Sequence, residues 1–264
     1  MFAFSNFFLA PSLDVAYSEL LKNKKNIILG GTSYLRMGNT SWNTAIDISN
    51  LNLNYIEEKD DFITIGSMTN FRDLETNHIL NTYFGNIFNI ALKDIIGVQF
   101  RKNVTAGATV FSKYGFSDLI PVLLALGTKI KLFAGGIVTL EDFLKETTVR
   151  QDILVEVLIP KIKTVCSFQT VRKSKTDYSI INLAICNNKN NISIAVGSRP
   201  GRAVLAKETM SILNNSDNLE LSIIDALKHI SEEISLDSNM RSSKVYRELL
   251  LTALLKKGIQ EVLK

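Results

Sequence analysis

The chain has 264 residues, which is enough for one large domain or for two or three small ones with a proper core. Hydrophobic residues make up 46% and charged residues 21%, and the formal net charge is only +4. The basic residues are scattered, so the sequence does not indicate a surface for nucleic acid or lipid. No window approaches about 18 uninterrupted apolar residues, and we therefore expect no membrane span.

Few side chains in the sequence are suited to catalysis. Two cysteines, Cys166 and Cys186, cannot by themselves hold an iron–sulfur cluster or a closed zinc site, and the two histidines, His78 and His229, lack metal-ligand spacing. Nucleotide fingerprints, P-loops and nucleophile elbows are absent. We therefore expect a cofactor to carry any chemistry. The cysteine content and the lack of a basic segment ahead of the apolar N-terminal residues predict a cytoplasmic protein.

The first part of the chain alternates helical and strand patterns. Apolar spacing and capping residues predict helices over residues 13–21, 70–74, 83–95 and 118–127, with a short helix beginning at 139. Runs of β-branched residues predict strands over residues 26–29, 45–48, 62–65, 128–133 and 153–160, the last of them ended by a proline. The chain thus opens as an α/β unit.

The pattern changes near residues 161–164. Three strand-like runs follow, over residues 164–173, 179–188 and 192–198, with asparagine-rich turn residues between the second and third. This spacing predicts an antiparallel meander. Three helices are expected after it, over about 202–213, 220–234 and 242–263. We therefore expect two α+β modules that meet near residue 162.

Two segments of small residues stand out as possible binding loops. Gly30-Gly31-Thr32-Ser33 follows the strand over residues 26–29, and glycines allow main-chain N–H groups to come close to a phosphate. Residues 105–109 (T-A-G-A-T) form the second segment, and Asp118 stands just ahead of a predicted helix. Taken alone, the first segment is more often only a turn, and the second has a plain loop as its simpler interpretation, with Asp118 as an ordinary helix N-cap.

Seven segments, in order along the whole chain, resemble the FAD-binding subunit of the molybdenum hydroxylases, the xanthine dehydrogenase and carbon monoxide dehydrogenase group. "IILGGTSYL" is similar to the family's A-G-G-T-D-L loop, and "QFRKNVTAGAT" to Q-I-R-N-x-A-T-I-G-G-N. The others are "APSLDVAYSELL", "ITIGSMTNFRDLE", "DILVEVLIP", "VRKSKTDYSIINLA" and "SSKVYRELLLTALLKKGI". Seven segments in register make a chance match improbable.

The resemblance implies a mixed α+β fold of the CO-dehydrogenase flavoprotein type. Its FAD-binding domain would have two parts, over residues 1–55 and 56–162, and a C-terminal domain over 163–264 would carry an antiparallel sheet with helices. It implies FAD as the cofactor. It also implies an electron-transfer role between an iron–sulfur subunit and an acceptor such as NAD+, with a separate molybdenum-cofactor subunit oxidising the substrate.

The resemblance also assigns binding residues by position. The diphosphate would lie on the first loop, formed by Ile28, Leu29, Gly30, Gly31, Thr32 and Ser33, with Leu35 packed nearby. The second loop would be Thr105, Ala106, Gly107, Ala108 and Thr109. Asp118 would approach the ribose or diphosphate, Ile153 and Leu154 would lie beside the isoalloxazine ring, and Lys173 or Arg172 would reach its polar edge.

One departure from the family pattern supports an alternative. Ala108 stands where the family has a glycine, and an alanine at a positive φ would cost roughly 1 kcal/mol or more. The alternative is a scaffold subunit of the same complex that has lost FAD. A free-standing flavin oxidase is disfavoured, because neither loop contains a histidine or cysteine to serve as a base or covalent anchor.

Overall fold

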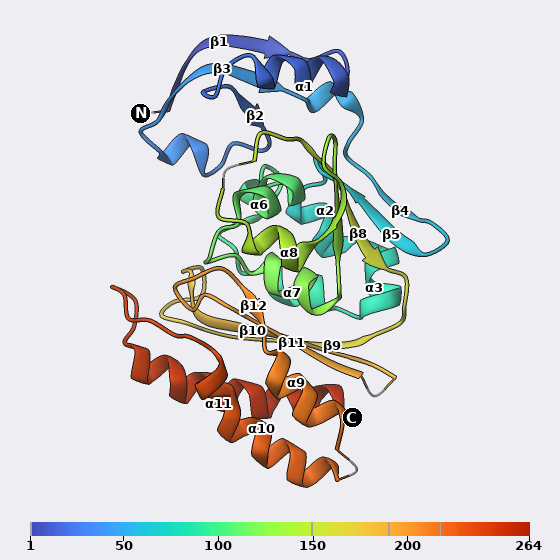
Figure 1. Cartoon of the computed structure of the whole chain (residues 1–264), viewed down its shortest axis with the longest axis vertical. Coiled ribbons are helices and arrows are strands. Elements are labelled where there is room, and N and C mark those ends of the chain that lie inside the picture. Colours follow the sequence, from blue (N-terminus) through green and yellow to red (C-terminus); the bar gives the residue numbers. More distant parts are fainter. Residues whose placement is uncertain (1, 149, 190, 217) are drawn as a thin grey trace.

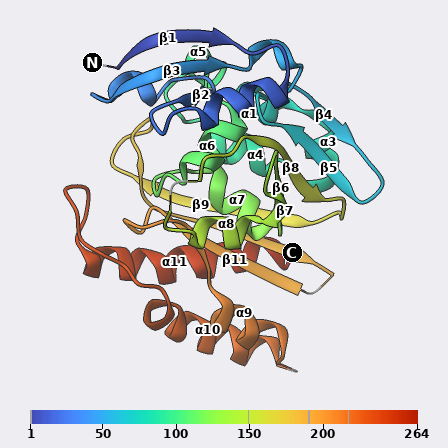
Figure 2. The ribbon, with the colours of Figure 1, turned by 45° about the horizontal axis from the view of Figure 1, so that its top comes forward.

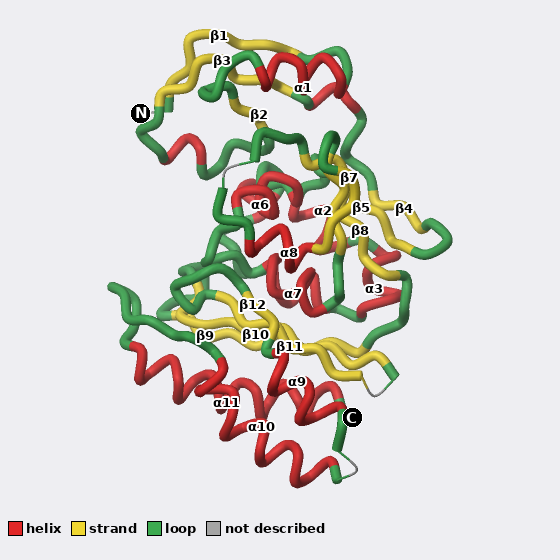
Figure 3. The backbone as a smooth tube through the Cα atoms, in the orientation of Figure 1, coloured by secondary structure: helices red, strands yellow, loops and turns green. Residues whose placement is uncertain are grey.

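The computed structural model describes residues 2–148, 150–189, 191–216 and 218–264 (Figure 1). Three β-sheets follow one another along the long axis of the molecule. A small sheet built from the N-terminus lies at one end, a sheet with short helices occupies the middle, and the C-terminal sheet with its long helices lies at the other end (Figures 1 and 3).

The N-terminal sheet has three parallel strands in the order β1-β3-β2. Helix α1 (Leu13–Leu21) lies over the sheet and has the predicted bounds, because the Ser12 side chain accepts a hydrogen bond from the Val15 N–H and begins the helix there. The sequence did not predict the first of these strands. The strands are β1 (Ala3–Leu9), β2 (Ile27–Leu29) and β3 (Ser41–Asp47), and two short 3-10 helices follow at Leu35–Met37 and Ser49–Leu51.

The middle sheet has five antiparallel strands in the order β4-β5-β8-β6-β7. They are β4 (Ile56–Glu58), β5 (Phe62–Gly66), β6 (Lys129–Leu132), β7 (Gly136–Thr139) and β8 (Leu154–Pro160). The helices of this part are α2 (Phe71–Thr76), α3 (His78–Phe84), α4 (Ile87–Leu92), α5 (Val98–Arg101), α6 (Ala106–Ser112), α7 (Leu119–Ala125) and α8 (Leu140–Lys145). Of these helices, α7 lies next to the C-terminal sheet (Figure 2), whereas α6 packs against β5 and β8 of the middle sheet.

The C-terminal sheet is antiparallel, in the order β12-β11-β10-β9, and confirms the predicted meander. Both of its faces are covered, which explains the continuous apolar run in β10: Ile181, Leu183 and Ile185 face helices α9 to α11, whereas Ala184 and Cys186 join the core of the middle part. The elements are β9 (Val165–Arg172), β10 (Ser179–Asn188), β11 (Asn191–Gly197), β12 (Val204–Leu205), α9 (Lys207–Asn214), α10 (Leu219–Glu233) and α11 (Lys244–Val262).

Three predicted elements differ from the structure for identifiable reasons. The helix expected over residues 83–95 begins only at Ile87, as α4, because Gly85 takes a positive φ of 58° that ends the preceding helix α3 at Phe84. The helix expected from residue 202 begins only at 207, since Val204 and Leu205 pair with β11. The expected loop over residues 105–109 is the start of α6, with Thr105 as its N-cap.

The mixed α+β fold with an antiparallel C-terminal sheet is confirmed. We propose the division into residues 1–55, 56–162 and 163–264 as the structural units of the chain, because each of the three sheets is drawn from one of these segments. Across residues 2–148, 150–189, 191–216 and 218–264, no helix is long and apolar enough to cross a membrane.

Candidate functional site

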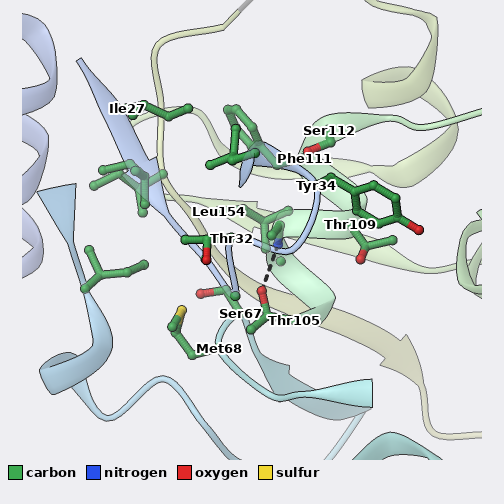
Figure 4. Close-up of a pocket in the computed structure, with 18 of the residues that line it drawn as sticks. Ile27, Thr32, Tyr34, Ser67, Met68, Thr105, Thr109, Phe111, Ser112 and Leu154 are labelled. Carbon is green, nitrogen blue, oxygen red and sulfur yellow. Dashed lines mark hydrogen bonds between the residues drawn. The ribbon is translucent and has the colours of Figure 1, made fainter. Parts of the chain in front are cut away.

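A cavity of about 240 Å³ lies between the N-terminal sheet and the middle part of the chain (Figure 4). Strand and helix ends form its walls: the end of β2, the end of β5, the start of α6 and the segment that leads into β8. Most of the residues predicted from the sequence line it, namely Ile28, Gly30, Gly31, Thr32, Ser33, Leu35, Thr105, Gly107, Ala108, Thr109, Ile153 and Leu154.

The first glycine loop packs directly against the backbone ahead of α6. A Cβ atom on Gly31 would lie 1.2 Å from the carbonyl oxygen of Asn103, and one on Gly30 would lie 2.5 Å from the Cβ of Ala108. Only glycine fits at either position. Thr32 takes a positive φ of 58°, and the main-chain N–H groups of residues 31–34 donate no hydrogen bond to any group of the described chain. The loop therefore offers free donors to a ligand.

The second segment does not offer its main-chain donors in the same way. Within α6, the N–H groups of Ala106 and Gly107 donate to the carbonyls of Thr69 and Ser67, at 2.9 and 2.8 Å. The N–H of Ala108 donates to the Thr105 side chain at 3.4 Å (the dashed line in Figure 4). The segment over residues 105–109 is therefore not the main-chain phosphate loop that was predicted. It is the capped start of a helix, and its small residues let the first loop pack closely.

Two polar atoms in the cavity wall are buried without a partner. The Ser67 hydroxyl and the Trp42 indole N–H find no hydrogen-bond acceptor or donor among the residues that the structure describes. Leaving a buried polar group unpaired costs about 1–3 kcal/mol, so such groups usually have a partner that is missing from the protein alone. Both atoms are therefore candidates to contact a bound ligand.

Asp118 lies in a second, smaller cavity of about 110 Å³. Its carboxylate is buried and accepts hydrogen bonds from Arg172 and Ser179, each at 2.7 Å, and from Asn182 at 2.6 Å. In the described chain its side chain makes no N-cap bond to α7. Asp118 is the N-cap residue of α7 by position, as predicted, but the Ser117 hydroxyl accepts the hydrogen bond from the Ile120 N–H at 3.2 Å, and the Asp118 carboxylate pairs with the buried guanidinium of Arg172.

The two cavities share the wall residues Tyr34, Val104, Thr109 and Tyr114. Burial, together with a hydrogen bond to Tyr178, raises the pKa of Tyr34 well above its ordinary value, so its hydroxyl stays protonated. The Tyr34 ring packs against Phe100, Tyr114 and Phe116. An aromatic cluster thus separates the glycine loop from Asp118.

Three other predicted residues lie outside the main cavity wall. Leu29 precedes the glycine loop on β2 and Ala106 is buried in α6, so neither side chain lines the cavity. Lys173 is exposed and lines neither cavity, whereas its neighbour Arg172 lines the smaller one with Asp118.

Sequence reasoning missed several residues of the cavity wall. They include Trp42, Ser67, Met68, Phe111 and Arg150. Ser67 and Met68 belong to the family segment "ITIGSMTNFRDLE", and their position directly after I-G could have identified them as wall residues. No pattern marked the other three. Among the described residues, no group of three or more histidines, cysteines or acidic residues is placed to hold a metal ion.

Comparison with known proteins assigns the family. The model of the FAD binding domain in molybdopterin dehydrogenase matches residues 2–162, and that of the CO dehydrogenase flavoprotein C-terminal domain matches residues 166–262. The chain belongs to the FAD-binding medium subunits of the molybdenum hydroxylases. The expected flavoprotein fold and the expected cofactor, FAD, are thereby confirmed.

Individual relatives of this medium subunit are distant in sequence. It is 26% identical to the glyceraldehyde dehydrogenase medium chain of Sulfolobus acidocaldarius over 236 residues, which cover 82% of each chain. The fold is similar to a chain of CO dehydrogenase from Oligotropha carboxidovorans, with a TM-score of 0.88, 17% identity and coverage of 97% and 96%. A chain of quinoline 2-oxidoreductase from Pseudomonas putida gives a TM-score of 0.85 at 18% identity, with the same coverage.

The residues in the cavity suit FAD. Free N–H groups at residues 31–34 and the Thr32 hydroxyl can hold a diphosphate, and glycines let it approach. The Ser33 hydroxyl donates to the Gly31 carbonyl at 3.4 Å. Apolar wall residues such as Ile28 and Leu154 suit the flat rings of FAD on either side of the glycine loop. The unpaired Ser67 and Trp42 groups are further donors for so polar a ligand.

Ala108 does not exclude FAD, because it lies in a helix and needs no positive φ. We expect Ala108→Gly to lower the free energy of unfolding by about 0.5–1 kcal/mol, as for a glycine placed in a helix, and to leave FAD affinity within about twofold. Urea unfolding and FAD titration measure the two effects. Ala253→Gly, at an exposed position of α11, is the matched control. A marked gain in FAD affinity for Ala108→Gly would show that the methyl group crowds the phosphates.

Proposed function

We propose that this chain is the electron-transfer subunit of a molybdenum hydroxylase complex. It would receive electrons from an iron–sulfur subunit and pass them to an acceptor such as NAD+, while a molybdenum-cofactor subunit oxidises the organic substrate. The observation that carries the proposal is the glycine loop with free main-chain donors, set in a cavity of a chain that belongs to the FAD-binding family.

In this function the chain binds and orients its cofactor and does not itself catalyse proton or group transfer. Bound FAD supplies the redox chemistry, because its ring system accepts and releases electrons. The main-chain donors of the loop over residues 31–34 would hold the diphosphate, and the small residues at the start of α6 would let it approach. The apolar wall would keep water from the rings, and the Tyr34 hydroxyl, which is hydrogen-bonded to Tyr178, lies where the two cavities meet.

The partners and the acceptor rest on the family resemblance. The relatives named above come from glyceraldehyde dehydrogenase, CO dehydrogenase and quinoline 2-oxidoreductase, so the complex is proposed to oxidise a small organic or one-carbon substrate, with a xanthine-type purine as one member of this class. We propose NAD+ as the electron acceptor because the chain resembles the xanthine dehydrogenase group. The cytoplasm is the proposed compartment, based on the low cysteine content.

The proposal predicts a yellow protein with a flavin absorption spectrum when FAD is added. The chain has one tryptophan, Trp42, and it lines the cavity, so bound FAD should quench the intrinsic fluorescence in a saturable way. Titration of the purified chain with FAD measures both signals. Loaded protein that is reduced with dithionite without oxygen should then be reoxidised by NAD+ if NAD+ is the acceptor.

The same titration tests the alternative scaffold function. A colourless protein whose Trp42 fluorescence stays unchanged in excess FAD would favour a partner-binding subunit that has lost its cofactor. Riboflavin at the same concentration is the matched control, since it carries the ring system without the diphosphate that the glycine loop is expected to hold.

A further inference from the structure

Ser67 is a buried hydroxyl whose position has no structural explanation in the protein alone. It follows the last residue of β5, its side chain is 3% exposed, and its Oγ finds no hydrogen-bond partner in the described part of the chain. It lines the main cavity, and Figure 4 shows it near Thr32 and Thr105 in the wall. An alanine would fill the same space without burying a polar atom, so the hydroxyl destabilises the protein alone unless something else binds it.

The backbone of Ser67 is held on both sides. Its N–H donates to the carbonyl of Val155 at 2.9 Å, and its carbonyl accepts from the Gly107 N–H at 2.8 Å. A Cβ on Gly107 would lie 2.5 Å from the Cβ of Ser67, so helix α6 packs against this residue as closely as a glycine allows. The Ser67 side chain is therefore positioned by two neighbouring elements before any ligand arrives.

The charges in the cavity wall favour an anionic partner for this hydroxyl. Lys24 and Arg150 line the cavity, although Arg150 is paired with Glu146. The one acidic residue in the described lining, Asp152, accepts hydrogen bonds from the N–H groups of Ala134 and Gly135 at 3.0 and 2.9 Å. The N–H groups at the start of α6 are likewise occupied within the chain. On this side of the cavity, the Ser67 hydroxyl is thus a donor that remains available for a phosphate.

We propose that the Ser67 hydroxyl donates a hydrogen bond to a phosphate oxygen of FAD, opposite the main-chain donors of residues 31–34. This inference rests on the proposed function, because it requires FAD in the main cavity. Ser67 is a binding residue, and it replaces the contact that the main chain at the start of α6 does not supply. The inference also explains why a buried, unpaired hydroxyl stands here.

The test compares Ser67→Ala with Thr64→Val. Thr64 lies on β5, three residues before Ser67, is 1% exposed and has a hydroxyl that is also unpaired within the described chain, but it does not line the cavity. We expect Ser67→Ala to raise the dissociation constant for FAD by about 10- to 100-fold, the range for one hydrogen bond to a charged group. Thr64→Val should leave it within about twofold. Both variants without FAD should unfold at the wild-type temperature or above.

Phosphorus NMR of bound FAD identifies the acceptor. The two diphosphate resonances should shift in Ser67→Ala and stay in place in Thr64→Val. The inference is overturned by an unchanged FAD dissociation constant in Ser67→Ala, by unchanged phosphorus resonances, or by a lowered unfolding temperature of the FAD-free variant, which would indicate a structural role. Failure of the wild-type chain to bind FAD would instead overturn the proposed function, and this inference with it.

Discussion

The Gly31→Ala variant is expected to bind FAD on the order of 100-fold more weakly than the wild type. Its new Cβ would lie 1.2 Å from a main-chain carbonyl oxygen of Asn103, so the loop must move away from α6. The shift would displace main-chain donors from the diphosphate, and two lost hydrogen bonds to a charged group at about 1.5 kcal/mol each account for that factor. Quenching of Trp42 fluorescence by FAD gives the dissociation constant.

Gly97→Ala is the matched control for this variant. No described atom lies within 4 Å of a Cβ placed on Gly97, and its φ of −159° is open to any residue. As an N-cap it should lose up to about 1 kcal/mol in stability, with FAD affinity unchanged. FAD binding by Gly31→Ala within about threefold of the wild type would mean that the first loop does not contact the diphosphate.

Asp118→Ala is expected to lower the free energy of unfolding by about 3–5 kcal/mol, because it leaves the Arg172 guanidinium buried without a counter-charge. The side chains of Arg172 and Asp118 are 9% and 5% exposed, and their atoms are 2.7 Å apart. Ser179 and Asn182 would lose an acceptor as well. An ordinary N-cap at this position would account for only about 1 kcal/mol. Urea unfolding monitored by circular dichroism distinguishes the loss expected for a buried ion pair from the smaller loss expected for an N-cap.

Two further variants complete this comparison. Asp225→Ala removes a carboxylate from an exposed pair with Lys228, 3.5 Å away, and should change stability very little. The double variant Asp118→Ala/Arg172→Met should recover part of the loss, because no unpaired charge remains buried. Purely additive losses would argue against a coupled ion pair. FAD affinity measured on Asp118→Ala also tests whether this residue reaches the ribose or diphosphate.

Local sequence patterns determined the elements whose stability comes from near neighbours. Helix α1 begins at its Ser12 cap, α11 begins after Ser243, and the turn-rich stretch after residue 186 folds as the predicted hairpin of β10 and β11. The glycine loop was also identifiable, because glycine is required wherever two backbones come this close. The order of the seven family segments gave the family and the cofactor.

Patterns failed where a distant contact decides the conformation. Small residues such as those over 105–109 suit a loop or a helix, and the carbonyls of Ser67 and Thr69 select the helix by accepting its first N–H groups. The strand β1 is stabilised by parallel pairing with β3, some 38 residues later in the chain (Ala3 opposite Ser41). Neither contact is visible in a window of neighbouring residues.

The sequence by itself determined that this is an FAD-binding subunit with a glycine loop at residues 30–33, since those features follow from residue type and order. Only the tertiary structure decided what each polar group in the site faces. Asp118 meets Arg172 from 54 positions away, and Ser67 is left unpaired in the cavity that the glycine loop also lines. Hydrogen-bond partners of buried groups are chosen by the packing of whole elements, and that packing is a property of the folded chain.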